Sequence, residues 1–147
     1  MNPDFLDIIH ALSDAEARFI IVGAYALNVY INPRATGDLD IWVEPTPENA
    51  VKIMAALREF GAPLADITES DFAQPGTTLQ IGLPPRRIDL LTDLSGLQFG
   101  EAWADRRMFP IGPFTVPFLS KDALIKNKRA TGRPKDLVDL EELEKGD

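Results

Sequence analysis

A short apolar run, Phe19–Val22, ends abruptly at Gly23, and this boundary constrains the fold more than any other feature of the chain. Four consecutive aromatic and β-branched residues closed by a glycine are typical of a buried strand. Residues 5–12 before the run and residues 24–30 after it carry apolar side chains at helical spacing. Helix and strand patterns therefore alternate, which predicts an α/β (α+β) fold.

The remainder of the chain continues this alternation. Strands are predicted at 38–43, 77–83, 86–91 and 114–118, and further helices at 47–60, 100–107, 121–131 and from 134 onward. Because some strands are joined by hairpins and others through helices, we expect a mixed β-sheet flanked by helices. We expect a single domain over residues 1–147, with a core at about 15–118 and a C-terminal helical segment at about 120–145.

Composition excludes several kinds of chemistry. The 147 residues contain no cysteine and one histidine, so disulfides, thiolate metal sites, cysteine nucleophiles and His-rich metal clusters are ruled out. No apolar run is long enough for a membrane span, and the acidic start lacks the basic region of a signal peptide. We therefore expect a cytoplasmic protein without a membrane partner, whose chemistry rests on carboxylates, basic side chains and backbone amides.

The charge is unevenly distributed along a chain with a net charge of −8. Residues 1–72 hold 12 acids and 4 bases, whereas the stretch 121–135 holds six bases and one acid. Such an acidic chain does not attract nucleic acid as a whole, but a local basic stretch can bind a polyphosphate. The alternative is an ordinary solvated helix face.

Two carboxylates, Asp38 and Asp40, stand two residues apart on a predicted strand and so project from the same face. A third acid, Asp89, interrupts the apolar strand 86–91, where an unpaired carboxylate would be costly. A shared hard cation, Mg²⁺ or Mn²⁺, would relieve both the repulsion and that cost. Taken alone, Asp38 and Asp40 could simply be solvent-exposed acids, and an arginine could take the place of the cation beside any one of the three carboxylates.

Gly23 lies where the first strand turns into a helix, and the exposed amides of a helix start favour anionic oxygens. A tight turn is the plainer explanation of this glycine. Taken together, a phosphate-binding turn, a carboxylate pair and a third carboxylate describe a site for a metal-bound nucleoside triphosphate.

Three segments carry a resemblance to a known family: VGAYAL at 22–27, RATGDLDI at 34–41 and RIDLL at 87–91. Their order and spacing resemble the DNA polymerase β-type nucleotidyltransferase superfamily. The segment LIKNKRATGRPKDL at 124–137 resembles its bacterial, minimal branch related to the AbiEii-type toxins. The resemblance implies a nucleotidyltransferase-like mixed sheet with C-terminal helices, and transfer of an NMP from an NTP, such as ATP, to an RNA or protein hydroxyl. It also implies the role of a toxin held by an antitoxin partner.

The same resemblance implies roles for individual residues. Asp38, Asp40 and Asp89 would be catalytic and would hold two Mg²⁺ ions, with Mn²⁺ as a substitute. Lys128 and Asp136 would also be catalytic. The residues expected to contact the nucleotide or its phosphates are Gly23, Ala24, Arg34, Thr36, Lys128 and Arg133. Arg34 and Thr36 flank the carboxylate pair, and contacts within the loop are the alternative role for both. Lys128 could equally be a solvated helix lysine, and Asp136 and Asp139 could simply favour the positive end of a helix.

Two other functions stay open. Ala24 stands where the family has glycine or serine, and the related toxins are longer chains, which suits a catalytically degenerate nucleotide-binding or protein-interaction module. A phosphatase or glycosidase could use the same acids. Aspartate-nucleophile phosphatases, however, place their Asp-x-Asp after a hydrophobic strand, whereas here the pair begins the strand. Neither a Walker A loop nor a Gly-x-Gly-x-x-Gly turn is present.

Overall fold

The computed structural model describes residues 2–31 and 37–145, and in this part of the chain it contains seven helices and six strands. The helices are α1 (Pro3–Asp14), α2 (Gly23–Tyr30), α3 (Pro47–Phe60), α4 (Glu69–Phe72), α5 (Phe99–Ala104), α6 (Lys121–Thr131) and α7 (Pro134–Lys145). The strands are β1 (Phe19–Val22), β2 (Leu39–Val43), β3 (Thr78–Ile81), β4 (Ile88–Leu91), β5 (Arg107–Ile111) and β6 (Phe114–Phe118).

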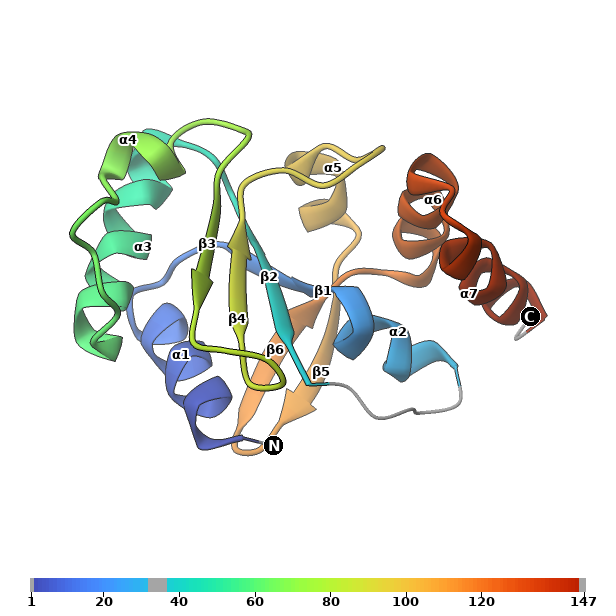
Figure 1. Cartoon of the computed structure of the whole chain (residues 1–147), viewed down its shortest axis with the longest axis horizontal. Helices are drawn as coiled ribbons and strands as arrows, with labels where there is room; N and C mark the ends of the chain where they lie inside the picture. Colours follow the sequence, from blue (N-terminus) through green and yellow to red (C-terminus); the bar gives the residue numbers. More distant parts are fainter. Residues whose placement is uncertain (1, 32–36, 146–147) are drawn as a thin grey trace.

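The six strands form one mixed sheet in the order β3-β4-β2-β1-β6-β5. The central pairs β2–β4 and β1–β6 are parallel, whereas β1–β2 and the outer pairs β3–β4 and β5–β6 are antiparallel. In Figure 1, α1, α3 and α4 gather on one side of this sheet, and α2, α6 and α7 lie on the other. The predicted mixed sheet flanked by helices is confirmed.

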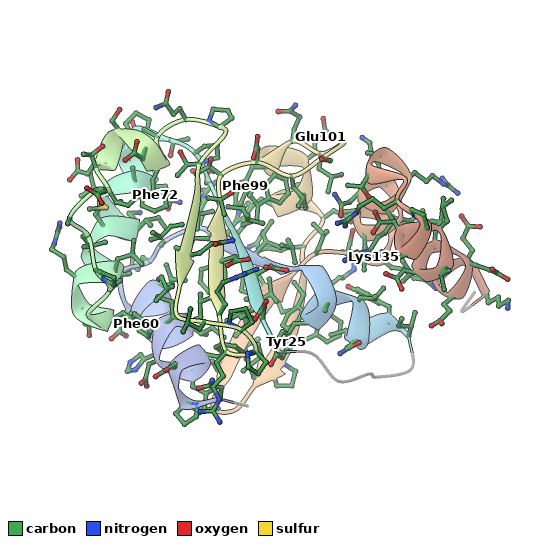
Figure 2. The ribbon with its side chains drawn as sticks, in the orientation of Figure 1. Tyr25, Phe60, Phe72, Phe99, Glu101 and Lys135 are labelled. Carbon is green, nitrogen blue, oxygen red and sulfur yellow. The ribbon has the colours of Figure 1, made fainter. Side chains whose placement is uncertain are left out.

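The core forms because the central strands bury nearly every side chain. All four residues of β1 are buried, and in β2 only Asp40 is partly exposed. Helices α1 and α3 cover the sheet with the apolar positions that their 3.6-residue spacing predicts. Trp42 of β2 is 1% exposed and packs edge-on against Phe99 of α5, which is labelled in Figure 2, with ring centroids 5.1 Å apart.

Strand β5 was missing from the prediction, which extended a helix over 100–107; the structure ends α5 at Ala104 and begins β5 at Arg107. The strand escapes pattern analysis because it is an edge strand, mostly exposed, with Pro110 inside it. The predicted strands 38–43, 77–83 and 86–91 are each shorter in the structure, so Asp38 and Arg87 precede β2 and β4 by one residue.

None of the helices in the described part of the chain combines the length and apolar character that crossing a bilayer requires.

Asn49, 3% exposed at the start of α3, ties this helix to the beginning of β1 and the end of β2. Its Oδ1 accepts the Arg18 backbone N–H at 2.8 Å, and its Nδ2 donates to the backbone carbonyls of Arg18 at 3.0 Å and Glu44 at 3.1 Å. One buried amide thus bonds to three backbone groups; the carbonyls of Arg18 and Glu44 also accept the backbone N–H groups of Glu44 and Thr46, whereas the Arg18 N–H is bonded by Asn49.

We expect Asn49→Ala to lower the free energy of unfolding by about 1–3 kcal/mol, because it removes three hydrogen bonds of a buried amide and leaves the Arg18 N–H without that partner. Urea unfolding followed by circular dichroism measures the change. Lys52→Ala, on the exposed side of the same helix, is the control and should stay within about 0.5 kcal/mol of the wild type. Equal stabilities of the two variants would contradict this role of Asn49.

Candidate active site

The turn from β1 into α2 requires a glycine for two reasons. Gly23 has a φ of +68°, a conformation that residues with a Cβ rarely adopt. A Cβ at this position would also overlap Oδ2 of Asp40 on the neighbouring strand. The first turn of α2 receives no side-chain cap from its N-cap residue Val22, so its backbone amides are available to a ligand.

Asp40 and Asp89 lie side by side because β2 and β4 are parallel and pair Asp40 directly with Asp89. Residues paired in this way project from the same face of a sheet. Asp89 is 7% exposed. Asp38, just before β2, lies near them, and its Oδ1 accepts the Arg87 backbone N–H at 3.2 Å. The structure therefore brings the three predicted acids to one region of the sheet.

A residue that the sequence analysis did not place in the site, Arg87, forms a two-pronged pair with Asp89. Its Nε donates to Asp89 Oδ1 at 2.8 Å and its Nη2 to Asp89 Oδ2 at 3.2 Å. The same Nη2 lies 3.5 Å from Asp38 Oδ2. Arginine is suited to this fork-shaped contact with a carboxylate. Asp89 is thus neutralised by a guanidinium, which the sequence analysis weighed as the alternative to a metal ion.

Burial, together with the neighbouring carboxylates, raises the pKa of Asp40 from its ordinary value of 3.8 to about 6. Burial is the largest cause, followed by the charge of Asp89, a hydrogen bond between the two carboxyl groups and the charge of Asp38. Arg87 acts in the opposite direction by offering a positive charge. A cation placed at Asp40 would relieve the same repulsion.

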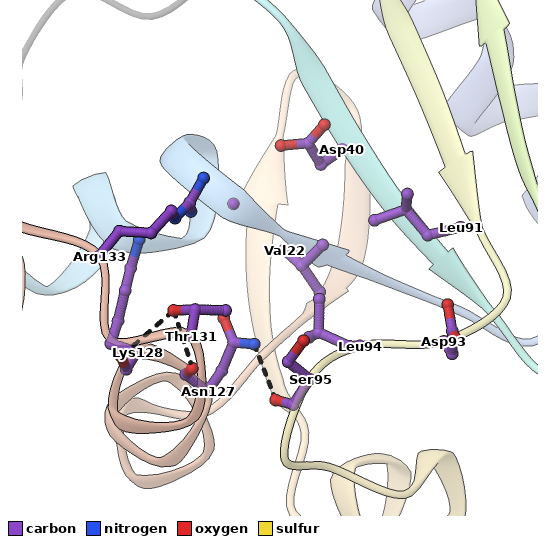
Figure 3. A pocket seen from close by; sticks show the side chains of 11 residues that line it. Val22, Asp40, Leu91, Asp93, Leu94, Ser95, Asn127, Lys128, Thr131 and Arg133 are labelled. Atoms are coloured by element: carbon purple, nitrogen blue, oxygen red, sulfur yellow. Dashed lines mark hydrogen bonds between the residues drawn. The ribbon is translucent and has the colours of Figure 1, made fainter. Parts of the chain in front are cut away.

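Two adjoining pockets, of about 360 and 430 Å³, open in front of Asp40. Both are lined by Gly23, Asp40, Lys128 and Arg133. The first pocket also includes Leu91, Asp93, Ser95, Asn127 and Thr131. In Figure 3, Lys128 and Arg133 lie on the helical side of this pocket, and Asp40 lies across from them on β2.

The second pocket is lined in addition by Ala24, Leu27, Lys135, Val138 and Asp139. Lys135 stands on α7 (Figure 2) and adds a third positive charge to this helical wall. Acidic and basic groups therefore face each other across the pockets, and the start of α2, which has no side-chain cap from Val22, lies beside them. Of the three predicted metal ligands, Asp40 is the one among the described residues that lines both pockets.

Lys128 is held in the wall by two aspartates: its Nζ lies 3.3 Å from Asp136 Oδ1 and 3.3 Å from Asp139 Oδ2. Asp136 is completely buried and also accepts hydrogen bonds from Thr131 Oγ1 at 2.7 Å and Arg133 Nε at 2.7 Å. These donors, Arg133 first, hold the pKa of Asp136 well below its ordinary value. Asp136 fixes Lys128 and Arg133 and is itself fully occupied.

Five of the predicted site residues line one or both pockets: Gly23, Ala24, Asp40, Lys128 and Arg133. The three predicted acids Asp38, Asp89 and Asp136 line neither pocket. Arg34 and Thr36 lie outside the described residues. Sequence reasoning missed Asp93, Ser95, Asn127 and Thr131 of the first pocket and the role of Arg87. The spacing of Arg87 and Asp89, two residues apart within the predicted strand 86–91, was the available signal for that pair.

The donor set consists of carboxylate oxygens, which suits a hard divalent cation. Among residues 2–31 and 37–145, however, no three acidic, histidine or cysteine side chains are arranged to enclose a metal ion as they stand. Each of the two oxygens of Asp89 accepts one hydrogen bond from Arg87. The residues fit Mg²⁺ in kind, because a carboxylate oxygen that accepts one hydrogen bond from arginine retains a second lone pair for a cation.

The fold is similar to that of a solved Thermotoga maritima protein described as a "putative nucleotidyltransferase". The two structures align with a TM-score of 0.58 and 14% sequence identity, over 99% of this chain and 93% of that chain. No protein-family model and no curated protein matches the sequence. The chain therefore has a nucleotidyltransferase-like mixed α/β fold, which confirms the predicted fold class.

The raised pKa of Asp40 predicts a stability that depends on pH in metal-free buffer. Between about pH 4 and pH 6 the native state binds more protons than the unfolded state, so the free energy of unfolding falls as the pH rises through this window. Asp40→Asn removes this dependence, and we expect it to be more stable than the wild type by about 1 kcal/mol at pH 7, with no gain below pH 4.

Urea unfolding at several pH values in the presence of a chelator measures this effect. Asp66→Asn, an exposed aspartate distant from the site in sequence, serves as the control and should follow the wild type. If the free energies of unfolding of Asp40→Asn and the wild type change in parallel between pH 4 and pH 6, the raised pKa of Asp40 is contradicted.

We expect Asp136→Asn to lower the free energy of unfolding by about 2–4 kcal/mol at pH 7, because it leaves Lys128 and Arg133 without their buried partner. Since the native pKa of Asp136 is lowered, its contribution is present above about pH 4 and is lost as the pH falls further. Glu141→Gln removes an exposed ion pair with Lys145 on the same helix and should cost less than about 0.5 kcal/mol. Equal losses in the two variants would refute the buried role of Asp136.

Proposed function

We propose that this protein is a metal-dependent nucleotidyltransferase that binds a nucleoside triphosphate in the pockets in front of Asp40. One observation carries the proposal: Asp40 faces Lys128 and Arg133 across pockets that also include the uncapped start of α2. A triphosphate bound with a divalent cation needs both kinds of wall, an acidic one for the cation and a basic one for the phosphates. The nucleotidyltransferase-like fold supports the same function.

In this proposal each part of the chain has a separate task. Asp38, Asp40 and Asp89 hold Mg²⁺ or Mn²⁺, and the amides of Gly23 and Ala24 receive phosphate oxygens. When bound, the metal lowers the pKa of the acceptor hydroxyl and neutralises the charge of the leaving pyrophosphate. Lys128 offers a fixed point charge to the phosphates, and its ion pairs with Asp136 and Asp139 keep it in place before the nucleotide arrives. Asp136 is then a positioning residue.

Arg133 supplies a more adaptable charge. Its side chain is 58% exposed although its guanidinium is paired with Asp136. Arg133 can therefore contact phosphate without a change in the core, and phosphate binding is the role that the sequence predicts for it. The acceptor that we propose is a hydroxyl group of RNA or protein, and the segment 124–137 supports a role as the toxin of a toxin–antitoxin pair.

The proposal is tested by measuring Mg²⁺-dependent binding of each NTP and transfer of label from α-³²P-labelled NTPs to RNA and protein fractions. We expect the wild type to bind and to transfer label, and Asp40→Asn to lose at least about 10-fold in binding and all transfer. Because Asp40→Asn is expected to be more stable at pH 7, unfolding does not explain such a loss. Asp66→Asn is the matched control. Nucleotide binding that is equal in both variants would refute this site.

A second function is favoured by the Arg87–Asp89 pair, which occupies the third acid, and by Ala24, which lacks the hydroxyl of a serine. It is a catalytically degenerate module that binds nucleotide without transferring it. The same experiment separates the two functions: binding that is lost in Asp40→Asn, with no label transfer from any NTP by the wild type, would leave only the module.

A further inference from the structure

The basic wall of the second pocket carries three cations, and two of them already have acidic partners. Lys128 Nζ lies 3.3 Å from Asp136 Oδ1 and 3.3 Å from Asp139 Oδ2, and Arg133 Nε donates to Asp136 Oδ2 at 2.7 Å. The two positive and two negative formal charges of this cluster cancel. Lys128 and Arg133 keep further N–H groups for a phosphate, but the cluster has no net charge with which to attract one.

Lys135, the second residue of α7, is the third cation of this wall. Its side chain is exposed and forms no ion pair or hydrogen bond with any other residue of the described ranges 2–31 and 37–145. The ammonium group of Lys135 therefore contributes the positive charge of the wall that no acid within these ranges compensates.

The place of Lys135 in α7 is unfavourable for the helix itself. The first turn of a helix carries partial positive charge, which favours acids there, whereas the last turn favours cations. Asp136 in the first turn and Lys145 in the last turn of α7 follow this rule, but Lys135 does not. A ligand explains a cation at this position better than the stability of the helix does.

We infer that Lys135 binds the outermost phosphate of the nucleoside triphosphate and supplies the net positive charge that attracts it to the pockets. This inference rests on the proposed function. Four residues line both pockets, whereas Lys135 lines the second pocket alone and Asp93 the first alone. Because the carboxylate of Asp93 repels phosphate and the ammonium of Lys135 attracts it, the phosphates extend toward α7 and the nucleoside toward Asp93.

Titration calorimetry with each NTP and the corresponding NDP in Mg²⁺ buffer tests this inference. We expect Lys135→Ala to weaken NTP binding at least about fivefold and NDP binding less, because the third phosphate is the one that contacts Lys135. Lys145→Ala is the matched control. It removes the same charge from the other end of α7, lines neither pocket, and should change both affinities less than about twofold.

The stability of the variants separates a contact with the nucleotide from a loss of structure. Because Lys135 opposes the helix dipole, Lys135→Ala should raise the midpoint of urea unfolding while it weakens NTP binding, whereas Lys145→Ala should lower the midpoint. Lys135→Arg keeps the charge and should bind NTP within about threefold of the wild type. Equal NTP affinities of Lys135→Ala and the wild type, or equal losses in Lys135→Ala and Lys145→Ala, would overturn the inference.

The outcomes also distinguish this inference from the proposed function. If the wild type binds NTP and Lys135→Ala binds it equally, the inference is wrong and the proposed site stands. If Lys135→Ala weakens NTP binding but Asp40→Asn does not, the inference stands and the proposed role of Asp40 is wrong. If the wild type binds no NTP, the inference and the proposed function are both wrong.

Discussion

The crowding of three carboxylates at the centre of the sheet is the constraint on which the rest of the site depends. The parallel pairing of β2 with β4 places Asp40 beside Asp89, and burial strengthens their repulsion. Such a concentration of negative charge is relieved either by a proton, as the raised pKa of Asp40 shows, or by a cation. Arg87 provides a positive charge within the chain, and its ion pair with Asp89 stabilises the metal-free site.

The first residue of α2, Gly23, lies directly against the Asp40 carboxylate. The backbone at Gly23 passes so close to the Asp40 carboxylate that no side chain fits between them. The helix start is thereby brought next to the acids, and its amides offer partial positive charge at the edge of an acidic region. A ligand that carries both a cation and anionic oxygens fits this boundary better than either a bare cation or a bare anion.

The basic wall is independent of the acidic one. Lys128 has its own acids, Asp136 and Asp139, and Arg133 shares Asp136. Because these charges are paired within α6 and α7, they do not collapse across the pocket onto Asp40. The two walls stay apart, and the space between them stays open to a ligand. This separation explains why Asp136, predicted to be catalytic by resemblance, is buried and fully occupied.

Hydrophobic periodicity determined most of the fold. The buried strands β1 and β2 and the amphipathic helices α1 and α3 each carry a pattern that only one kind of element buries efficiently. The edge strand β5 carries no such pattern, because it is exposed and receives its hydrogen bonds from β6 alone. Its pairing partner, and not its own sequence, makes it a strand.

Within the site, the sequence by itself determined which groups could carry chemistry: the acids Asp38, Asp40 and Asp89, the turn at Gly23 and a basic C-terminal stretch. Only the tertiary structure decided how these charges are paired. Partners such as Arg87 with Asp89 and Lys128 with Asp136 are chosen by distance and burial, because a charge is stabilised by whatever the fold places within a few ångströms of it. The sequence fixes which charged side chains are present, and the packing of strands and helices decides which of them form pairs.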